Sequence, residues 1–208
     1  MGLKGRWLGF CRRSGARGDL RGAFADLDRR YREPGRHYHT WAHVASCLRA
    51  LERVRGLARE PAALELALWF HDAVYEPGAA DNEERSAELA GRWGFALSLA
   101  PAVIDSARQL ILATRHTPAD SAGAGDEALV KDIDLTVLGS RAGRYRAYER
   151  RIGREYARLP PERFRAGRAE LLRGFLERPA LYATPFFRER CEQRARRNLA
   201  RARARLAS

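Results

Sequence analysis

The stretch LALWFHDAVYEPGAADNEERSA, residues Leu66 to Ala87, begins as an apolar run and ends as an acidic, turn-rich segment. Between the two, His71 and Asp72 stand side by side. A helix that is apolar on nearly all sides is typical of the centre of a domain. A histidine and an aspartate at the end of such a helix either cap it or hold an ion, and the rest of the chain has to distinguish these interpretations.

The remainder of the chain follows a helical pattern almost throughout. Alternating apolar and polar runs of strand length are scarce, and β-branched residues are few. Thr40 suits the N-cap of a helix that runs on to Val54, and Pro61 suits the first turn of the central helix. The sequence therefore predicts an all-α protein, a bundle of about eight helices.

The length of 208 residues suits one domain, with or without a terminal extension. We expect residues 1–18 to be disordered and residues 19–208 to form a single domain that ends in a basic helix. The apolar patch from Trp7 to Phe10 is too short for the core of a signal peptide. No apolar run approaches the roughly 20 residues that span a bilayer, so we expect a cytoplasmic protein without a membrane partner.

The net charge of +13 invites a nucleic-acid interpretation. However, 39 basic residues include lysine only at Lys4 and Lys131, and eight arginines gather after residue 187. No aromatic stacking platform accompanies them, so nucleic acid is disfavoured and a packing helix with a solvated arginine face is preferred. The three cysteines suggest no disulfide framework, and Cys47 is expected to be a small core residue.

Only five histidines occur, and three of them fall in RHYHTWAH, residues 36–43. His39 and His43 are four residues apart, so they share one face if a helix begins near Thr40. Farther on, Asp132 and Asp134 stand at the start of an expected apolar helix, where unpaired carboxylates are costly. Each residue has a plainer explanation, such as a core histidine or an N-cap, but together they form a ligand set for a divalent cation.

The segments RHYHTWAHV, LALWFHDAVYEPGAADNEERSA, LILATRH and DIDLTVLG, taken in this order, resemble the HD-domain superfamily of metal-dependent phosphohydrolases, in a bacterial branch. The resemblance covers residues 31–206. It implies an HD-domain helical bundle that hydrolyses a small phosphate ester, with nucleotides among the candidates, by metal-activated water. It implies one divalent ion (Mn, Mg, Ni, Co, Fe or Zn) and these ligands: His43, His71, Asp72 and Asp134. Asp134 is preferred to Asp132 because it adjoins the apolar LTVL run.

Two residues are candidates for catalysis under this resemblance, Asp72 and Glu83. Glu83 is expected to act as a general base or to hold a water, although an acid in a first helical turn is also favoured by the helix dipole. The candidate phosphate ligands stand in or beside the matched segments: Arg36, His39, Arg115 and His116. Arginine binds phosphate through a bidentate fork, and His39 has the alternative of orienting a metal ligand.

Two other functions stay open at this point. HD-type di-iron oxygenases resemble the same pattern but add two histidines between the His-Asp pair and the last aspartate, whereas only His116 lies in that interval here. One ion is therefore favoured over two. A non-enzymatic nucleic-acid-binding protein is the other alternative, and it depends on the basic C-terminal helix alone.

Overall fold

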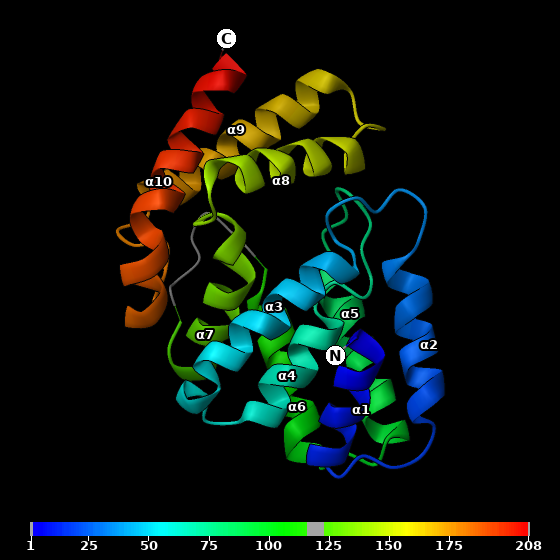
Figure 1. The fold of residues 1–208 in the computed structure, drawn as a ribbon. Coiled ribbons are helices and arrows are strands. Elements are labelled where there is room, and N and C mark those ends of the chain that lie inside the picture. The colour runs from blue at the N-terminus through cyan, green and yellow to red at the C-terminus, as the bar shows by residue number, and fades with distance from the viewer. Residues whose placement is uncertain (1, 116–122, 208) are drawn as a thin grey trace. The chain divides into compact units, whose positions relative to one another are not determined.

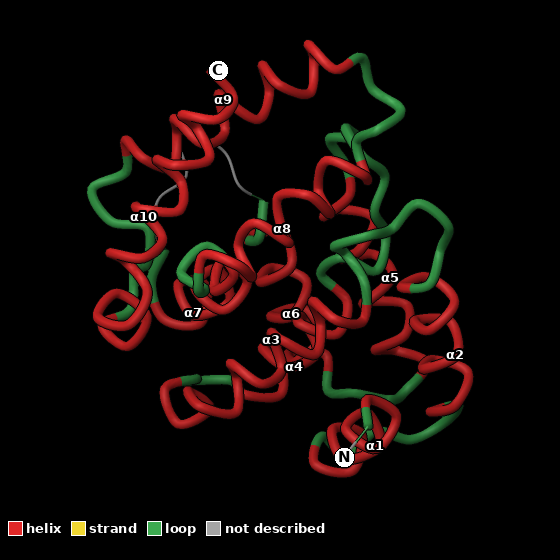
Figure 2. Tube along the Cα trace, turned by 45° about the horizontal axis from the view of Figure 1, so that its top comes forward, coloured by secondary structure: helices red, strands yellow, loops and turns green. Residues whose placement is uncertain are grey.

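The computed structural model describes residues 2–115 and 123–207, and helices account for every regular element in these ranges (Figures 1 and 2). It contains ten α-helices and two short 3-10 helices, and no strand occurs in the described ranges. The prediction of an all-α fold is confirmed, with two α-helices more than expected. The chain divides into two compact units, residues 1–115 and 116–208, where the sequence suggested one domain from residue 19 onward.

The first unit is built around a buried central helix. Its elements are α1 (Leu3–Arg13), α2 (Leu20–Tyr31), α3 (Trp41–Val54), η1 (Arg55–Leu57), α4 (Pro61–Phe70), α5 (Asn82–Ala96) and α6 (Pro101–Ala113). Every residue of α4 from 63 to 70 is buried, and α4 packs against α1, α3, α5 and α6. Its one charged side chain, Glu65, forms ion pairs with Arg13 and Arg55. The prediction that this helix lies in the centre is confirmed.

Helix α1 corrects the expectation that the first eighteen residues are disordered. Trp7, Phe10 and Cys11 are buried on one face of α1. The Nε1 of Trp7 donates to the carbonyl of Leu20 at 2.7 Å, and its ring lies edge-on to Trp69 at 5.4 Å. An apolar patch too short for a membrane or signal segment is still long enough to provide one buried helix face.

The helix starts follow local rules of capping. Thr40 accepts a hydrogen bond from Ala42 N at 3.3 Å, which confirms it as the N-cap of α3. Pro61 and Pro101 stand in the first turns of α4 and α6. The N–H groups of a first turn have no acceptor within the helix, so a proline there costs no helical hydrogen bond. Asp81 occupies the N-cap of α5, but its side chain makes no capping bond within the described chain and lies 3.6 Å from Arg85 instead.

The second unit contains α7 (Gly125–Asp134), η2 (Leu135–Val137), α8 (Ala142–Glu155), α9 (Pro161–Glu177) and α10 (Pro185–Ala207). Helix α10 packs against α8 and α9 and buries Phe187, Ala195, Leu199 and Ala202. Four arginines of α10 donate to main-chain carbonyls within the described chain. Among them, Arg194 bonds Gly139, and Arg196 bonds the end of α9 and the loop after it. These contacts support the interpretation of α10 as a packing helix.

Asp132 and Asp134 lie at the end of α7, not at the start of a helix as the sequence suggested. The carboxylate of Asp132 accepts hydrogen bonds from Ala183 N at 2.9 Å, Thr184 N at 2.8 Å and Thr184 Oγ1 at 2.6 Å. Burial nevertheless raises the pKa of Asp132, with these bonds acting in the opposite direction. Asp132 therefore fixes the turn that leads into α10, which accounts for one of the two carboxylates. No helix in the described part of the chain meets the length and hydropathy that a membrane crossing requires.

Candidate metal centre

The carboxyl end of α4 has all of its last four carbonyls satisfied, although it lies in the core. A helix end leaves these groups without partners inside the helix. Two are bonded by later backbone N–H groups, one by an imidazole and one by a tyrosine hydroxyl. The bonds run from His71 N to Ala67 O, from His71 Nδ1 to Leu68 O, from Tyr31 Oη to Trp69 O and from Ala73 N to Phe70 O.

The bond from His71 to Leu68 fixes the chemical form of the imidazole. A carbonyl only accepts, so at 3.2 Å the Nδ1 of His71 carries the hydrogen. Nε2 is then the ring nitrogen that faces His43 and Asp72, and a metal-bound histidine commonly donates its other ring N–H to a carbonyl in this way. His71 is 2% exposed, so the helix end that the fold must satisfy also sets the direction of this ligand.

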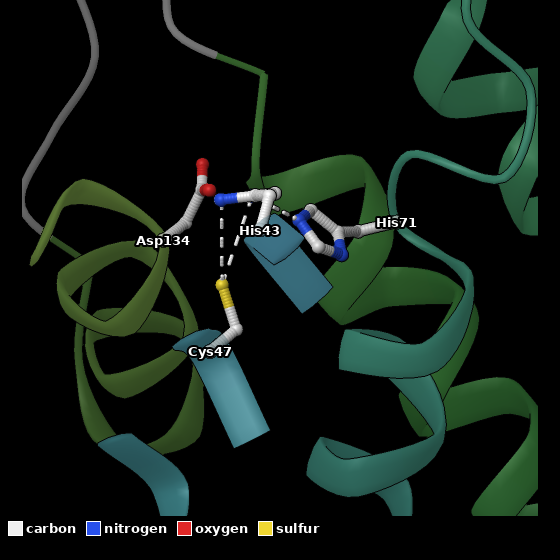
Figure 3. A group of neighbouring side chains, drawn as sticks. All are labelled: His43, Cys47, His71 and Asp134. Atoms are coloured by element: carbon white, nitrogen blue, oxygen red, sulfur yellow. Dashed lines mark hydrogen bonds between the residues drawn. The ribbon is translucent and has the colours of Figure 1, made fainter. Parts of the chain in front are cut away.

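Three donor atoms from α3 and the end of α4 converge on one point. The Nε2 atoms of His43 and His71 lie 3.0 Å apart, and Figure 3 shows the two rings turned toward each other. The Oδ2 of Asp72 lies 3.2 Å from His71 Nε2 and 3.3 Å from His43 Nε2. Both histidines are buried. The structure therefore brings these three predicted residues together, and their role as metal ligands stays a prediction.

These separations fit donors around a single cation. Two donors about 2.1 Å from one ion stand about 3.0 Å apart at a right angle and about 3.4 Å apart at the tetrahedral angle. In addition, Asp72 Oδ2 is buried and accepts no hydrogen bond from the residues that the structure describes. A buried carboxylate oxygen of this kind is costly unless a cation or donor reaches it. The donor set of His43, His71 and Asp72 therefore suits a divalent ion.

Asp72 is held in its ionised form. Burial on its own would raise the pKa of this carboxyl, but the nearby imidazoles of His71 and His39 outweigh burial and keep the pKa well below its usual range. The pair His71 and Asp72 also lies at the carboxyl end of α4, where the helix dipole is negative and favours a cation. Electrostatics and geometry thus agree on the same occupant.

Arg36 acts on the main chain around the metal pair. Its Nη1 donates to Asp72 O at 2.6 Å and His39 O at 3.2 Å, and its Nη2 donates to Ala73 O at 3.0 Å. Nε and Nη2 also contact the carboxylate of Glu33. These contacts occupy the N–H groups of Arg36 that we expected, from the sequence, to bind a phosphate. In the structure Arg36 therefore joins the segment before α3 to the turn after α4.

His39 lies beside the same carboxylate, and its charge is among those that lower the pKa of Asp72. Its ring stacks on Tyr75, with centroids 3.8 Å apart. Tyr38 stands against both histidines, 5.0 Å from the ring of His39 and 4.9 Å from that of His43. The structure thus brings His39 to the candidate centre between two tyrosines, which suits either of its expected roles.

Cys47 was not among the candidates from the sequence, but it belongs to this cluster (Figure 3). Its Sγ lies 3.6 Å from His43 Nε2, and ligand atoms of Cys47, His43 and His71 fall within 4.8 Å of one another. Burial would raise the pKa of the thiol, but His43 and His71 outweigh it and lower that pKa. The signal in the sequence was the spacing of four residues from His43, which places both side chains on one face of α3.

Glu83 and Arg115 form a second group, at the start of α5 and after α6. Arg115 Nε lies 3.5 Å from Glu83 Oε2, and its Nη2 pairs closely with Glu84. These carboxylates, Glu84 foremost, raise the pKa of Arg115. The structure therefore brings two predicted site residues together as an ion pair, and the catalytic role of Glu83 stays a prediction.

Two predicted residues stand apart from these groups. Asp134, also labelled in Figure 3, ends α7 of the second unit, and its place among the metal ligands stays a prediction. His116 lies outside the described residues. No family model, curated protein or solved structure matches the chain. The resemblance to the HD-domain superfamily therefore stays a prediction from the sequence.

Proposed function

We propose that this protein is a metal-dependent phosphohydrolase of the HD type, acting on a small phosphate ester. The observation that carries the proposal is the convergence of His43, His71 and Asp72 on one point at the end of the central helix. An imidazole whose Nδ1–H is bonded to a carbonyl, a carboxylate with a lowered pKa and a negative helix end all favour a divalent cation there.

The chain's own residues would divide the work in the following way. His43, His71 and Asp72 would hold one ion, and the resemblance to the HD-domain superfamily adds Asp134 to the proposed ligands. A bound divalent ion supplies polarisation of a phosphoryl oxygen and activation of water. Glu83 is proposed to take the proton of the attacking water at its carboxylate, with Arg115 orienting that carboxylate through their ion pair.

The proposed substrate is a small phosphorylated molecule, with nucleotides among the candidates. His39 lies beside Asp72 and stacks on Tyr75, so it is the proposed phosphate ligand next to the ion-binding carboxylate. Arg115 is 39% exposed and would bind phosphate in competition with two glutamates. Arg36 is proposed as a positioning residue, because its N–H groups are engaged by main-chain carbonyls and Glu33. A cytoplasmic location stays a prediction.

Metal analysis joined to a phosphatase screen tests the proposal. The protein is loaded in turn with Mn²⁺, Mg²⁺, Ni²⁺, Co²⁺ and Zn²⁺ and assayed on nucleotides and sugar phosphates. We expect one ion per chain and hydrolysis of at least one ester. Both should be lost in Asp72→Asn and kept in the matched control Asp81→Asn, whose carboxylate is exposed and pairs with Arg85.

Three results would contradict the proposal. Undiminished metal content in Asp72→Asn combined with His71→Ala would place the ion elsewhere. Two iron atoms per chain, with no turnover of any phosphate ester, would replace hydrolysis by the oxygenase alternative. Tight RNA binding that is sensitive to salt and persists without the metal would favour the nucleic-acid alternative.

A further inference from the structure

Cys47 lies in α3 next to the candidate metal centre, which sets it apart from an ordinary core cysteine. It stands one helical turn after His43, on the same face, and is 0% exposed. A buried free cysteine is common in protein cores and behaves there as a small apolar side chain. Cys11 in α1 is such a case, because it is equally buried among Trp7 and Phe10 and belongs to no group of metal-binding donors in the described chain.

The sulfur of Cys47 lies beside the two imidazoles. Its Sγ lies 3.6 Å from His43 Nε2 and 3.8 Å from His43 Nδ1, so it stands against the side of that ring. The same Nε2 lies 3.0 Å from His71 Nε2. In a tetrahedral site a sulfur about 2.3 Å and a nitrogen about 2.1 Å from the ion stand about 3.6 Å apart, so coordination by both atoms requires the His43 ring to rotate on binding. A ligand atom of each of the three residues falls within 4.8 Å of the other two. The sulfur therefore borders the point on which the two imidazoles converge.

We propose that Cys47 is a metal ligand, bound as the thiolate, and that this sulfur selects Zn²⁺ or another thiophilic cation over Mg²⁺. The inference rests on the metal site of the proposed function and goes further by naming a ligand and the class of ion. Binding breaks the S–H bond, forms a sulfur–metal bond and releases the proton to solvent. Thiolate and imidazole donors together favour zinc-class cations, while Mg²⁺ prefers carboxylates and water.

Cobalt substitution tests the assignment without relying on activity. The metal-free protein is titrated with Co²⁺, and absorption is recorded in the near ultraviolet, where a thiolate bound to Co²⁺ gives an intense charge-transfer band. We expect the band in the wild type and in the matched control Cys11→Ser. In Cys47→Ser we expect Co²⁺ still bound by equilibrium dialysis, the band absent, and Zn²⁺ affinity lowered by at least about tenfold, the lower end of the effect of removing a group that merely orients a ligand.

A measurement on the unaltered chain covers the case in which Cys47→Ser does not fold. Cadmium-113 bound to the wild type should resonate in the downfield range of thiolate-bearing sites, well away from sites with nitrogen and oxygen donors alone. Co²⁺ bound without the band, a band that persists in Cys47→Ser, or a cadmium signal typical of nitrogen and oxygen donors would each overturn the inference.

The outcomes separate this inference from the proposed function. A charge-transfer band without turnover of any phosphate ester would uphold the thiolate ligand and refute the phosphohydrolase. Turnover with Co²⁺ bound and no band would uphold the phosphohydrolase and refute the thiolate ligand. A wild-type protein that binds neither Co²⁺ nor Zn²⁺ would overturn both.

Discussion

Replacing Arg36 by lysine separates two roles that the sequence and the structure give to this residue. The sequence suggested a phosphate ligand, whereas the structure engages the guanidinium with three main-chain carbonyls and Glu33. The Arg36 side chain is 3% exposed. Lysine keeps the positive charge but presents its donors from a single point instead of a planar fork. A lysine therefore cannot bond the segment before α3 and the turn after α4 at the same time.

The size of the effect follows from the bonds that are lost. We expect Arg36→Lys to lose about two of the three carbonyl bonds, each contributing about 1–1.5 kcal/mol to the free energy of unfolding. The total loss is then about 2–3 kcal/mol, which is a factor of roughly 30–150 in the equilibrium constant for unfolding. With a urea dependence of about 2 kcal/mol per molar, the midpoint of unfolding should fall by about 1–1.5 M.

The assay is urea unfolding followed by circular dichroism, with metal affinity measured on the same samples. Because Arg36 bonds the carbonyl of Asp72, the affinity for Co²⁺ should fall about 10- to 100-fold, as for other groups that orient a ligand. The matched control is Arg32→Lys, since Arg32 is 68% exposed and pairs with Asp28; its change should stay within about 0.5 kcal/mol. An unchanged midpoint in Arg36→Lys, with a raised KM for the phosphate ester, would refute the reasoning and restore the phosphate role.

Four further changes have expected outcomes. Trp7→Ala should lower the free energy of unfolding by about 3–5 kcal/mol, because a buried ring leaves a cavity; an effect under about 1 kcal/mol would mean that α1 does not pack. Asp132→Ala should lower it by about 2–4 kcal/mol by leaving the two N–H groups before α10 without their acceptor, measured by thermal melting. Asp26 is bonded by Trp93, Arg29 and Arg30 and its pKa is lowered against the effect of burial, so its stabilisation is present above about pH 4 and is lost as the pH falls through its folded-state pKa; Asp26→Asn should lack that part of the acid-induced loss. Adding Zn²⁺ at about 100 times its Kd to metal-free protein should raise the free energy of unfolding by about 2.7 kcal/mol, a gain absent in Asp72→Asn.

Most of the fold was predictable because periodicity and helix punctuation are local properties. Thr40 as an N-cap and the prolines in first turns are determined by neighbours a few residues away, and both were confirmed. The disordered N-terminus was a wrong prediction, since Trp7 is stabilised by Leu20 and Trp69, which are distant in sequence. Likewise, the division into two compact units after Arg115 depends on which apolar faces meet in space, and the composition of the chain does not reveal those contacts.

The residues that meet at the candidate site could be named from the sequence, but the contacts that position them could not. His43, His71 and Asp72 could be named because donor types at helical spacing are visible in a sequence. The role of Arg36 could not be named, since every arginine is chemically able to bind a phosphate, and only the geometry shows this one among carbonyls. Asp134 could be preferred to Asp132 as a metal ligand from the sequence. The structural role of Asp132 could not be predicted, because its partners, Ala183 and Thr184, are some fifty residues away.

The stability of the central helix and the orientation of its candidate metal ligands share one cause. A helix buried along its whole length must find partners for its last carbonyls inside the protein. Here one of those partners is the Nδ1–H of His71, so satisfying Leu68 O turns Nε2 toward His43. The same end carries the negative pole of the helix dipole, and Asp72 adds a full charge held in its ionised form. A deeply buried helix that ends on an imidazole and a carboxylate thus gathers donors suited to a cation from the requirements of its own termination, and the proposed cation would neutralise the charge that this termination leaves buried.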